Sequence, residues 1–282
     1  MIFIWILAVL AAFFLAVMAV DCNRFVIRRY RCKMESLKKD GRFLLLSDLH
    51  NKSFGKGNEK LLTAIRRLNP DAILIAGDMY TSTKGGGMES AKALVCSLAA
   101  EYPVYYGNGN HEFKTRIYPE QFGNMYQEYI SAIKKAGVTH LVNDKAYLPD
   151  FNLEIYGAEI GWEYYGKFDS VKMEASYLGG LLGKPKAGQA SLLIAHNPDY
   201  FEAYARWGAD LVVSGHVHGG LMRLPFLGGV ISPAMKLFPK YDGGEFHEGK
   251  ATMVLGRGLG THTLPIRIFN PGELVVIEAG RW

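Results

Sequence analysis

Two histidines separated by one residue stand at the end of an apolar run in the C-terminal half of the sequence. His216 and His218 follow the apolar residues 209–213 within the series Ser-Gly-His-Val-His-Gly-Gly. In an extended segment, positions i and i+2 face the same side, so both imidazoles can point at one place. Such a pair can hold a metal ion, but taken alone it is as often a loop with two solvent-facing histidines.

Four further polar clusters favour the metal site. Each follows an apolar run of strand length: Asp48-Leu49-His50, Gly77-Asp78, Gly109-Asn110-His111-Glu112 and His196-Asn197. Ligands in open α/β sheets bind beyond the carboxyl ends of the strands, so we expect these clusters to converge. Their side chains offer oxygen and imidazole ligands for two divalent cations, without the thiolates of a structural zinc site: Asp48, His50, Asp78, Asn110, His196, His216 and His218.

The segments around these clusters alternate between strand and helix patterns. Short apolar runs predict strands over residues 43–46, 72–76, 103–106, 191–195, 209–213 and 275–278, and helical spacing predicts helices over 61–68, 88–100, 125–136 and 198–207. This alternation is typical of an α/β fold with parallel strands. The glycine-rich residues 219–260 instead predict short strands and long loops, which would form an antiparallel lip over the site.

The first twenty residues are expected to anchor the chain in a membrane. Ile2 to Val20 contains no charge and no proline, and nineteen helical residues reach roughly 28 Å, close to the thickness of a hydrocarbon core. A cleaved signal peptide is the alternative, because small residues suited to cleavage occur near Ala19. A signal peptide normally begins with basic residues, and this chain has none before Arg24.

The excess positive charge lies directly after this apolar segment. Residues 21–42 hold eight basic and three acidic side chains, which accounts for the whole net charge of +5. We therefore expect 21–42 to be a basic juxtamembrane connector that favours anionic lipid, with room for a short helix or strand, and 43–282 to be the catalytic domain. By the positive-inside rule the domain lies in the cytoplasm, with the opposite side as the alternative. Nucleic acid is not expected as a partner, because the folded part carries balanced charge.

The ordered motifs resemble those of the calcineurin-like metallophosphoesterases. The series Asp-x-His, Gly-Asp, Gly-Asn-His-Glu, His and Gly-His-x-His runs in that family's order from Phe43 onward. The apolar N-terminus, the run after His218 and the late segment from Arg257 are similar to the membrane-associated branch of YkuE- and YaeI-type phosphodiesterases. The sequence departs from the family at Glu112, where aspartate is commoner, and at Leu221, where this branch often has glutamine.

The resemblance implies a four-layer αββα sandwich and a two-metal hydrolase. It implies that Asp48, His50, Asp78 and His218 hold one ion and that Asp78, Asn110, His196 and His216 hold the other, with Asp78 bridging. His111 then stabilises charge on the phosphoryl group or protonates the leaving oxygen. Manganese is the expected metal, with iron, zinc or magnesium as alternatives.

Several other residues allow both a functional and a structural interpretation. The segment Gly-Arg-Gly-Leu-Gly at 256–260 could cradle a phosphate through its backbone N–H groups and Arg257, or form an ordinary hairpin. The aromatic residues Trp162, Tyr164, Tyr165 and Phe168 could pack in the core or receive an acyl chain. The three cysteines are odd in number and are expected to be free thiols.

Several functions remain open on the sequence. The favoured hypothesis is hydrolysis of a phosphodiester or pyrophosphate bond, in a lipid-linked substrate such as an acylated UDP-sugar. The alternatives are a phosphomonoesterase or cyclic-nucleotide phosphodiesterase acting on soluble substrates, and a metal-binding scaffold of the same fold without turnover. A complete ligand set argues for the enzyme.

Overall fold

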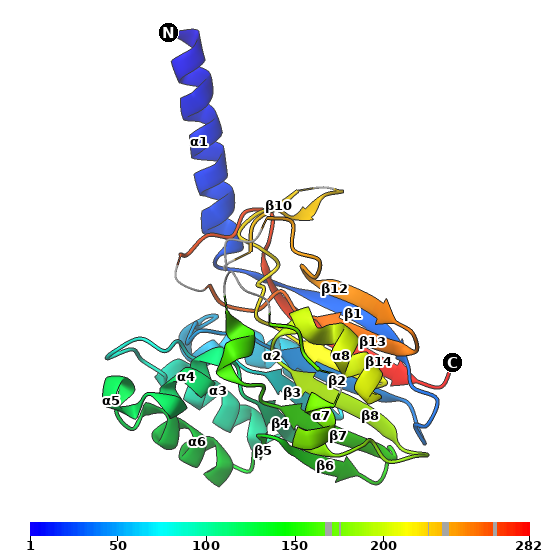
Figure 1. Ribbon diagram of the computed structural model, residues 1–282. Coiled ribbons are helices and arrows are strands. Elements are labelled where there is room, and N and C mark those ends of the chain that lie inside the picture. Colours follow the sequence, from blue (N-terminus) through cyan, green and yellow to red (C-terminus); the bar gives the residue numbers. More distant parts are fainter. Residues whose placement is uncertain (167–170, 175, 225, 233–236, 262–263) are drawn as a thin grey trace.

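Two six-stranded sheets form the centre of the molecule (Figure 1). This computed structural model describes residues 1–166, 171–174, 176–224, 226–232, 237–261 and 264–282. In spatial order, the first sheet contains β1 (Phe25–Lys33), β14 (Gly272–Gly280), β2 (Gly41–Leu46), β3 (Ala72–Ala76), β4 (Val104–Gly107) and β5 (Thr139–Leu141). The second contains β12 (Gly244–Glu248), β13 (Ala251–Leu255), β9 (Leu211–Ser214), β8 (Ala190–Ala195), β7 (Leu153–Ala158) and β6 (Asp144–Leu148).

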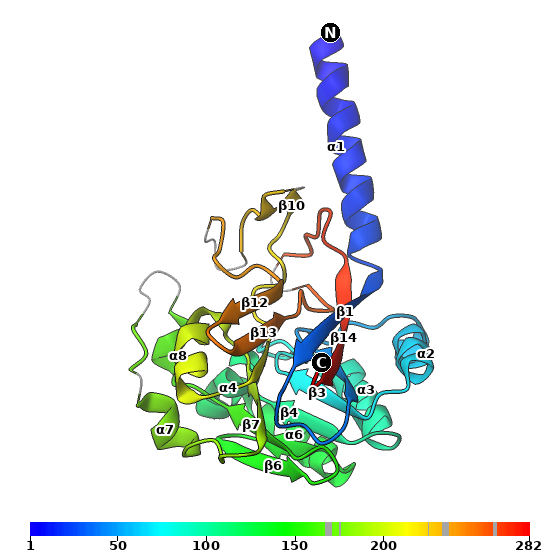
Figure 2. The same cartoon turned by 90° about the vertical axis from the view of Figure 1, so that its right-hand side faces the viewer.

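Helices cover the outer face of each sheet, and one further helix projects from the domain (Figures 1 and 2). The first sheet is accompanied by α2 (Glu59–Leu68), α3 (Glu89–Ala99), α4 (Asn110–Ile117), α5 (Pro119–Phe122) and α6 (Met125–Lys135). The second is covered by α7 (Tyr177–Leu182) and α8 (Phe201–Trp207). Single 3-10 turns occupy Lys56–Asn58, Trp162–Tyr165 and Pro198–Tyr200. The projecting helix is α1 (Ile2–Asp21).

Alternation along the strands explains why four layers form. In β2, Leu44 and Leu46 pack against the helices of the first sheet, whereas Phe43 and Leu45 face the second sheet. A strand that is apolar on both faces must be covered on both faces. A third core lies between the second sheet and α7 and α8, built by residues such as Tyr156 and Phe201. The predicted αββα sandwich is confirmed.

The residues that follow α1 do not form a connector as predicted. Phe25–Lys33 is the edge strand β1, which pairs in parallel with β14, so the folded domain begins well before Phe43. An edge strand tolerates charge on its solvent face, which is why its arginines resembled a linker. The strand also carries the basic residues away from α1, and Lys33 lies about 26 Å along the strand from Phe25. Lipid contact by the far end of this segment is therefore not supported.

The prediction for the glycine-rich segment is partly wrong. A short antiparallel pair, β10 (Arg223–Leu224) and β11 (Gly228–Gly229), does form outside both sheets. The later hairpin of β12 and β13 instead joins the second sheet, where β13 runs parallel to β9. Met253 and Leu255 of β13 are buried in the third core, so this part of the segment is a sheet edge.

The register of the first sheet places the end of α1 next to the predicted site. The start of β1 pairs with the start of β14, since Phe25 lies opposite Gly272. β14 is antiparallel to β2, so the carboxyl end of β2 lies at that same end of the sheet. The loop of Asp48 and His50 follows β2 directly. The apolar helix and the polar clusters thus meet at one end of the molecule.

Candidate metal centre

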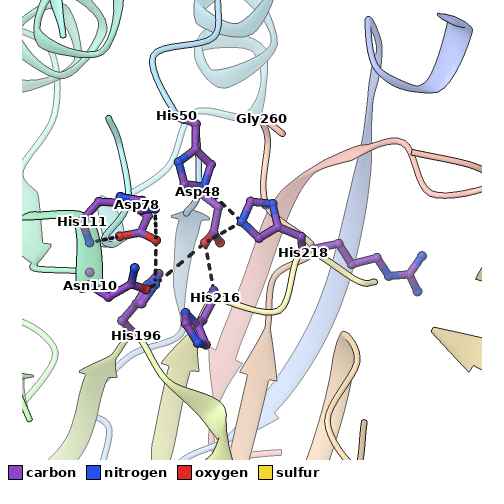
Figure 3. A network of polar contacts seen from close by, with 12 residues as sticks. Asp48, His50, Asp78, Asn110, His111, His196, His216, His218 and Gly260 are labelled. Atoms are coloured by element: carbon purple, nitrogen blue, oxygen red, sulfur yellow. Dashed lines mark hydrogen bonds and ion pairs between the residues drawn. The ribbon is translucent and has the colours of Figure 1, made fainter. Parts of the chain in front are cut away.

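The predicted ligands converge where strands of both sheets end (Figure 3). Asp48 and His50 follow β2, Asp78 follows β3, and Asn110 begins α4 after β4. From the second sheet, His196 follows β8, and His216 and His218 follow β9. All seven positions singled out from the sequence lie in this cluster, because parallel strands end at a common edge.

The side chains form two adjoining groups. In the first, the Nε2 atoms of His50 and His218 are 3.0 Å apart, and His218 Nε2 lies 3.4 Å from Asp48 Oδ1. In the second, His196 Nε2 lies 3.1 Å from Asp78 Oδ2 and 3.2 Å from Asn110 Oδ1. Potential ligand atoms of Asp78, His196 and His216 lie within 4.8 Å of one another, as do those of Asp48, His50 and His218. The cluster can therefore hold metal ions.

The ligand loops adopt a strained backbone. Asp48, His50, Asp78, His216 and His218 all have positive φ values, between 50° and 76°. Residues other than glycine rarely adopt this conformation, and its cost is typical of functional sites. Such a backbone turns the chain sharply after each strand and aims the side chain inward. The rest of the fold must offset that cost.

Two glycines permit the carboxylates to approach the backbone. A Cβ atom at position 215 would collide with Asp48 Oδ2, and one at position 109 would collide with Asp78 Oδ1. The space is used for hydrogen bonds, since the N–H groups of His216 and His111 donate to Asp48 and Asp78. Asp78 thereby sits at the N-terminus of α4, where the helix dipole favours a negative charge.

The buried carboxylates of the cluster require a positive charge close to them. Burial raises the pKa of Asp48 to about 6. Burial also disfavours charge on Asp78, but the imidazoles of His196 and His111 hold the pKa of Asp78 well below its usual range. Burial favours neutral His196, yet the carboxylates of Asp78 and Asp48 raise the pKa of His196 to about 10. Without a metal ion, a proton on His196 supplies the cation that the two carboxylates require.

The donor set fits divalent cations. Asp48 Oδ2 is buried and has no hydrogen-bond partner among the described residues, which suits an oxygen that binds an ion. His196 Nδ1 donates to the carbonyl of Ala76, so in the neutral imidazole that binds a metal ion the lone pair lies on Nε2, the atom beside Asp78. All ligands are oxygen or imidazole nitrogen, as manganese, iron, zinc or magnesium would accept. The free cysteines Cys22, Cys32 and Cys96 are not part of the cluster.

A comparison with known families agrees with this geometry. The family model described as calcineurin-like phosphoesterase matches residues 41–220. The chain belongs to this family. The resemblance inferred from the ordered motifs is thereby confirmed.

Individual relatives of this calcineurin-like phosphoesterase are distant. An uncharacterised metallophosphoesterase of Campylobacter jejuni, Cj0846, is 26% identical, and the match covers 87% of this chain but only 61% of the relative. Phosphodiesterase YaeI of Escherichia coli is 26% identical over 78% of this chain and 75% of its own. UDP-2,3-diacylglucosamine pyrophosphatase LpxG of Chlamydia muridarum is 24% identical over 84% of this chain and 83% of its own.

His111 of the phosphoesterase lies beside the cluster with a defined tautomer. The N–H of Ser82 donates to His111 Nδ1 over 2.9 Å, so Nδ1 is an acceptor. A neutral His111 therefore carries its proton on Nε2. That atom lies 3.9 Å from Asp78 Oδ2 and faces the metal groups. Ser82 was not predicted as a site residue, because an unremarkable serine in a loop gives no signal in the sequence.

Glu112, which stands where the family motif commonly has aspartate, binds the loop of Asp78. It is fully buried, and its two oxygens accept hydrogen bonds from the N–H groups of Asp78, Met79 and Gly109 and from the hydroxyl of Tyr106. Burial and the neighbouring Asp78 raise the pKa of Glu112 to about 7, while four donors at 2.7–2.9 Å favour its ionised form. Glu112 thus ties the Asp78 loop to the start of α4.

The predicted phosphate cradle at residues 256–260 is not supported. The N–H groups of Gly256, Leu259 and Gly260 donate to carbonyls of neighbouring loops, and that of Arg257 donates to Glu273. These donors are unavailable to a phosphate. The Arg257 side chain lies beside Glu273, with Nε 3.8 Å from its carboxylate. We therefore do not retain Arg257 as a substrate-binding residue.

A different arginine organises this loop. The guanidinium of Arg267 is fully buried and donates to the carbonyls of Arg257, Gly258 and Gly260, among others. The loop in turn holds the Asp48 segment, because Gly260 N–H donates to the Asp48 carbonyl. Sequence reasoning missed Arg267, since its partners are backbone atoms that leave no pattern in side-chain types.

The aromatic segment proves to be partly core and partly site. Tyr164 packs against Tyr177 and Tyr200 in the third core. Tyr165 lies next to the metal cluster, with its ring centroid 5.5 Å from that of His216, and Trp162 stacks beside Tyr165 at 5.9 Å. Phe168 lies outside the described residues.

Replacing Glu112 with glutamine should weaken both the fold and metal binding. The amide NH2 group would face backbone N–H groups, and lost hydrogen bonds to a buried charged group cost about 1.5–3 kcal/mol each. We expect a lower unfolding midpoint and a lower metal content, measured by thermal denaturation and elemental analysis.

Glu128→Gln, on the first turn of α6, is the matched control and should match the parent. A Glu112→Gln protein with parental stability and metal content would contradict the role assigned to this carboxylate.

Proposed function

We propose that the chain is a dinuclear-metal phosphoesterase that hydrolyses a phosphodiester or pyrophosphate bond. The observation that carries the proposal is the pair of adjoining ligand groups, with Asp78 between them and His111 beside them. Membership of the calcineurin-like phosphoesterases supports it, as do relatives named phosphodiesterase and pyrophosphatase. The complete ligand set argues against a scaffold without turnover.

The proposed ligand assignment follows the two groups. Asp48, His50 and His218 hold one divalent ion, Asn110, His196 and His216 hold the other, and Asp78 is shared. Manganese is the metal we favour, with iron, zinc or magnesium as alternatives. When bound, the two ions supply positive charge that polarises the phosphoryl group and acidifies water, which is the contribution of metals in such hydrolases.

His111 is proposed as the catalytic residue of the chain itself. With Nδ1 held by Ser82, the N–H on Nε2 points toward the metal groups and can donate to a phosphoryl oxygen or to the leaving oxygen. This donor is fixed before substrate arrives, so no reorganisation is needed when negative charge develops. Tyr165 and Trp162 extend from the site and offer an apolar wall to the rest of the substrate.

The substrate class proposed is a membrane-resident phosphodiester or pyrophosphate that carries a lipid. Three features support it: α1 could span a membrane, it enters at the same end of the sheet as the metal centre, and LpxG is named for a diacylated UDP-sugar. An acylated UDP-sugar is one candidate. A soluble phosphomonoester or cyclic nucleotide is the main rival, because it would need the same metal chemistry but no anchor.

The membrane topology proposed is a single pass with the domain on the cytoplasmic side. The basic residues that follow α1 lie close to it in sequence, as the positive-inside rule requires, although several pair with glutamates in the fold. Retention of α1 in the mature protein is part of this proposal.

Asp78→Asn should abolish turnover and reduce the content of both ions, because the shared carboxylate contributes to each group. Metal content of the purified chain and hydrolysis of bis(4-nitrophenyl) phosphate with added manganese measure the two effects. Asp150→Asn, at an exposed position, is the control and should behave as the parent. Parental activity in Asp78→Asn would refute the shared role.

His111→Ala should keep its metal and lose turnover by about a hundredfold or more, the scale of one lost acid or charge-stabilising group. The same two assays separate a ligand from a catalytic donor. His247→Ala removes an exposed imidazole on β12 and serves as the control. A loss of metal that parallels the loss of activity would make His111 a ligand instead.

The substrate class is tested with matched diesters that differ only in an acyl chain. The chain in detergent should show the higher kcat/KM for the lipid-bearing diester, because only that substrate gains transition-state binding energy from apolar contacts. The full chain is required, since a fragment starting at Phe43 would lack β1. Equal values, or a preference for small monoesters, would remove the lipid-linked substrate and leave the hydrolase standing.

A further inference from the structure

Three loops with exposed apolar side chains lie at the end of the domain from which α1 projects, and the β10 region lies to one side of that helix (Figures 1 and 2). Phe226 and Leu227 join β10 to β11, Leu237 and Phe238 follow β11, and Phe269 precedes β14. Phe226 is fully exposed and Phe238 is 58% exposed. Exposed apolar side chains gathered at one place mark an interaction surface.

Hydrogen bonds join these loops into one unit. Arg223 N–H donates to the Ile268 carbonyl, and Ile268 N–H donates to the Leu221 carbonyl. Phe238 N–H donates to the Val230 carbonyl, which links the loop of Leu237 and Phe238 to the residue that follows β11. The three loops therefore form one connected unit, and their exposed apolar side chains are called the aromatic rim below.

The backbone at the tips is set in a costly conformation. Phe226, Phe238 and Phe269 have φ values of 67°, 46° and 55°. Left-handed backbone is rare for a bulky residue. Strain kept at three separate exposed positions is typical of functional segments.

The position of Phe269 relates these loops to the apolar helix α1. Its ring centroid lies 6.3 Å from those of both Phe13 and Phe14 on α1. A spanning helix needs about twenty residues and α1 has twenty, so nearly its whole length is required inside the bilayer. Phe14 is seven residues before Asp21, roughly 10 Å along the helix axis. If α1 spans the bilayer, Phe269 lies at the depth of the acyl chains or just above them.

We propose that the aromatic rim inserts into the bilayer around α1 and docks the domain on the membrane surface. The inference rests on the membrane anchor of the proposed function and adds a second, independent membrane contact. Phenylalanine and leucine suit the boundary between headgroups and acyl chains. The rim is continuous with α1 through Phe269, so lipid is the occupant that the geometry favours over a protein partner.

Docking would place the metal centre at the level of the headgroups. Asn270 connects the two directly: its N–H donates to Asp21 at the end of α1, and its side-chain amide donates to the carbonyls of His218 and Gly220. Asp21 is buried at this junction, so the helix end is fixed against the ligand loop. A lipid phosphate could then reach the metal groups with its acyl chains still in the bilayer.

Fluorescence quenching by brominated lipid tests the insertion. The full chain is reconstituted in phosphatidylcholine vesicles with and without bromine on the acyl chains, as parent, Phe226→Trp and Phe238→Trp. Both variants should lose more tryptophan fluorescence to brominated lipid than the parent does, with a blue-shifted emission from the added residue. Tyr147→Trp, on β6 at the opposite end of the domain in Figure 1, should add only unquenched emission.

The parent separates failure of the rim from failure of the anchor. Trp5 lies within α1, so quenching of the parent reports insertion of the helix. If the parent is quenched but the emission added by Phe226→Trp and Phe238→Trp is not, the rim is refuted. The anchor and the proposed function would still stand. A parent without quenching would overturn the anchor and the rim together, and hydrolysis of a soluble diester would still test the metal centre.

A kinetic measurement gives the functional consequence. Phe226→Ser combined with Phe238→Ser should lower kcat/KM for a lipid diester presented in vesicles by about tenfold or more, because interfacial binding scales with buried apolar area. Activity on bis(4-nitrophenyl) phosphate should stay at the parental level, which also shows that the variant is folded. Equal activity of variant and parent on the vesicle substrate would count against docking.

Discussion

The site depends on two buried carboxylates held side by side, Asp48 and Asp78. Like charges in a dry environment repel strongly, so they require a cation between or beside them. The surroundings stabilise this pair, since the N–H groups of His216 and His111 donate to the carboxylates and glycines leave room for them. The left-handed backbone at five ligands is tolerable only in a scaffold that is rigid elsewhere. Three hydrophobic cores, which together cover both faces of each sheet, provide that rigidity.

Much of this was accessible from the sequence because the ligands are side chains at strand ends. A polar cluster after an apolar run marks the end of a buried strand, and parallel strands bring such ends together. The seven candidate ligand positions and the helices α2, α3 and α6 could therefore be predicted, whereas the four layers were implied by the family resemblance. Glu112 was noted only as a departure from the family motif, and its partners include backbone N–H groups of a loop more than thirty residues away. Backbone partners leave no trace in residue types.

The errors share a physical origin in sheet edges. β1 carries arginines on a solvent face, and the edge strand β12 lies with its neighbour β13 in a glycine-rich stretch, so these strands looked like segments outside a hydrophobic core. Edge strands need only one covered face and tolerate charge, which weakens the apolar signal that reveals central strands. Arg267 and Asn270 were missed for the reason that hid Glu112: they support the site through carbonyl oxygens of distant loops.

If α1 is the membrane anchor proposed above, its position bears on which substrates the enzyme can select. A tether alone raises the local concentration of any membrane-bound substrate, but it leaves the site free to turn away from the lipid. Here α1 is hydrogen-bonded through Asp21 and Asn270 to the loop that carries His218, so the orientation of the site relative to the helix is set by the fold. A fixed orientation has a cost, because a site facing the bilayer is less accessible to soluble phosphoesters. That cost is reasonable only for a substrate whose phosphate is itself fixed at the membrane surface. This geometry would hinder the access of a soluble phosphomonoester to the site. It therefore supports the proposed lipid-borne diester or pyrophosphate.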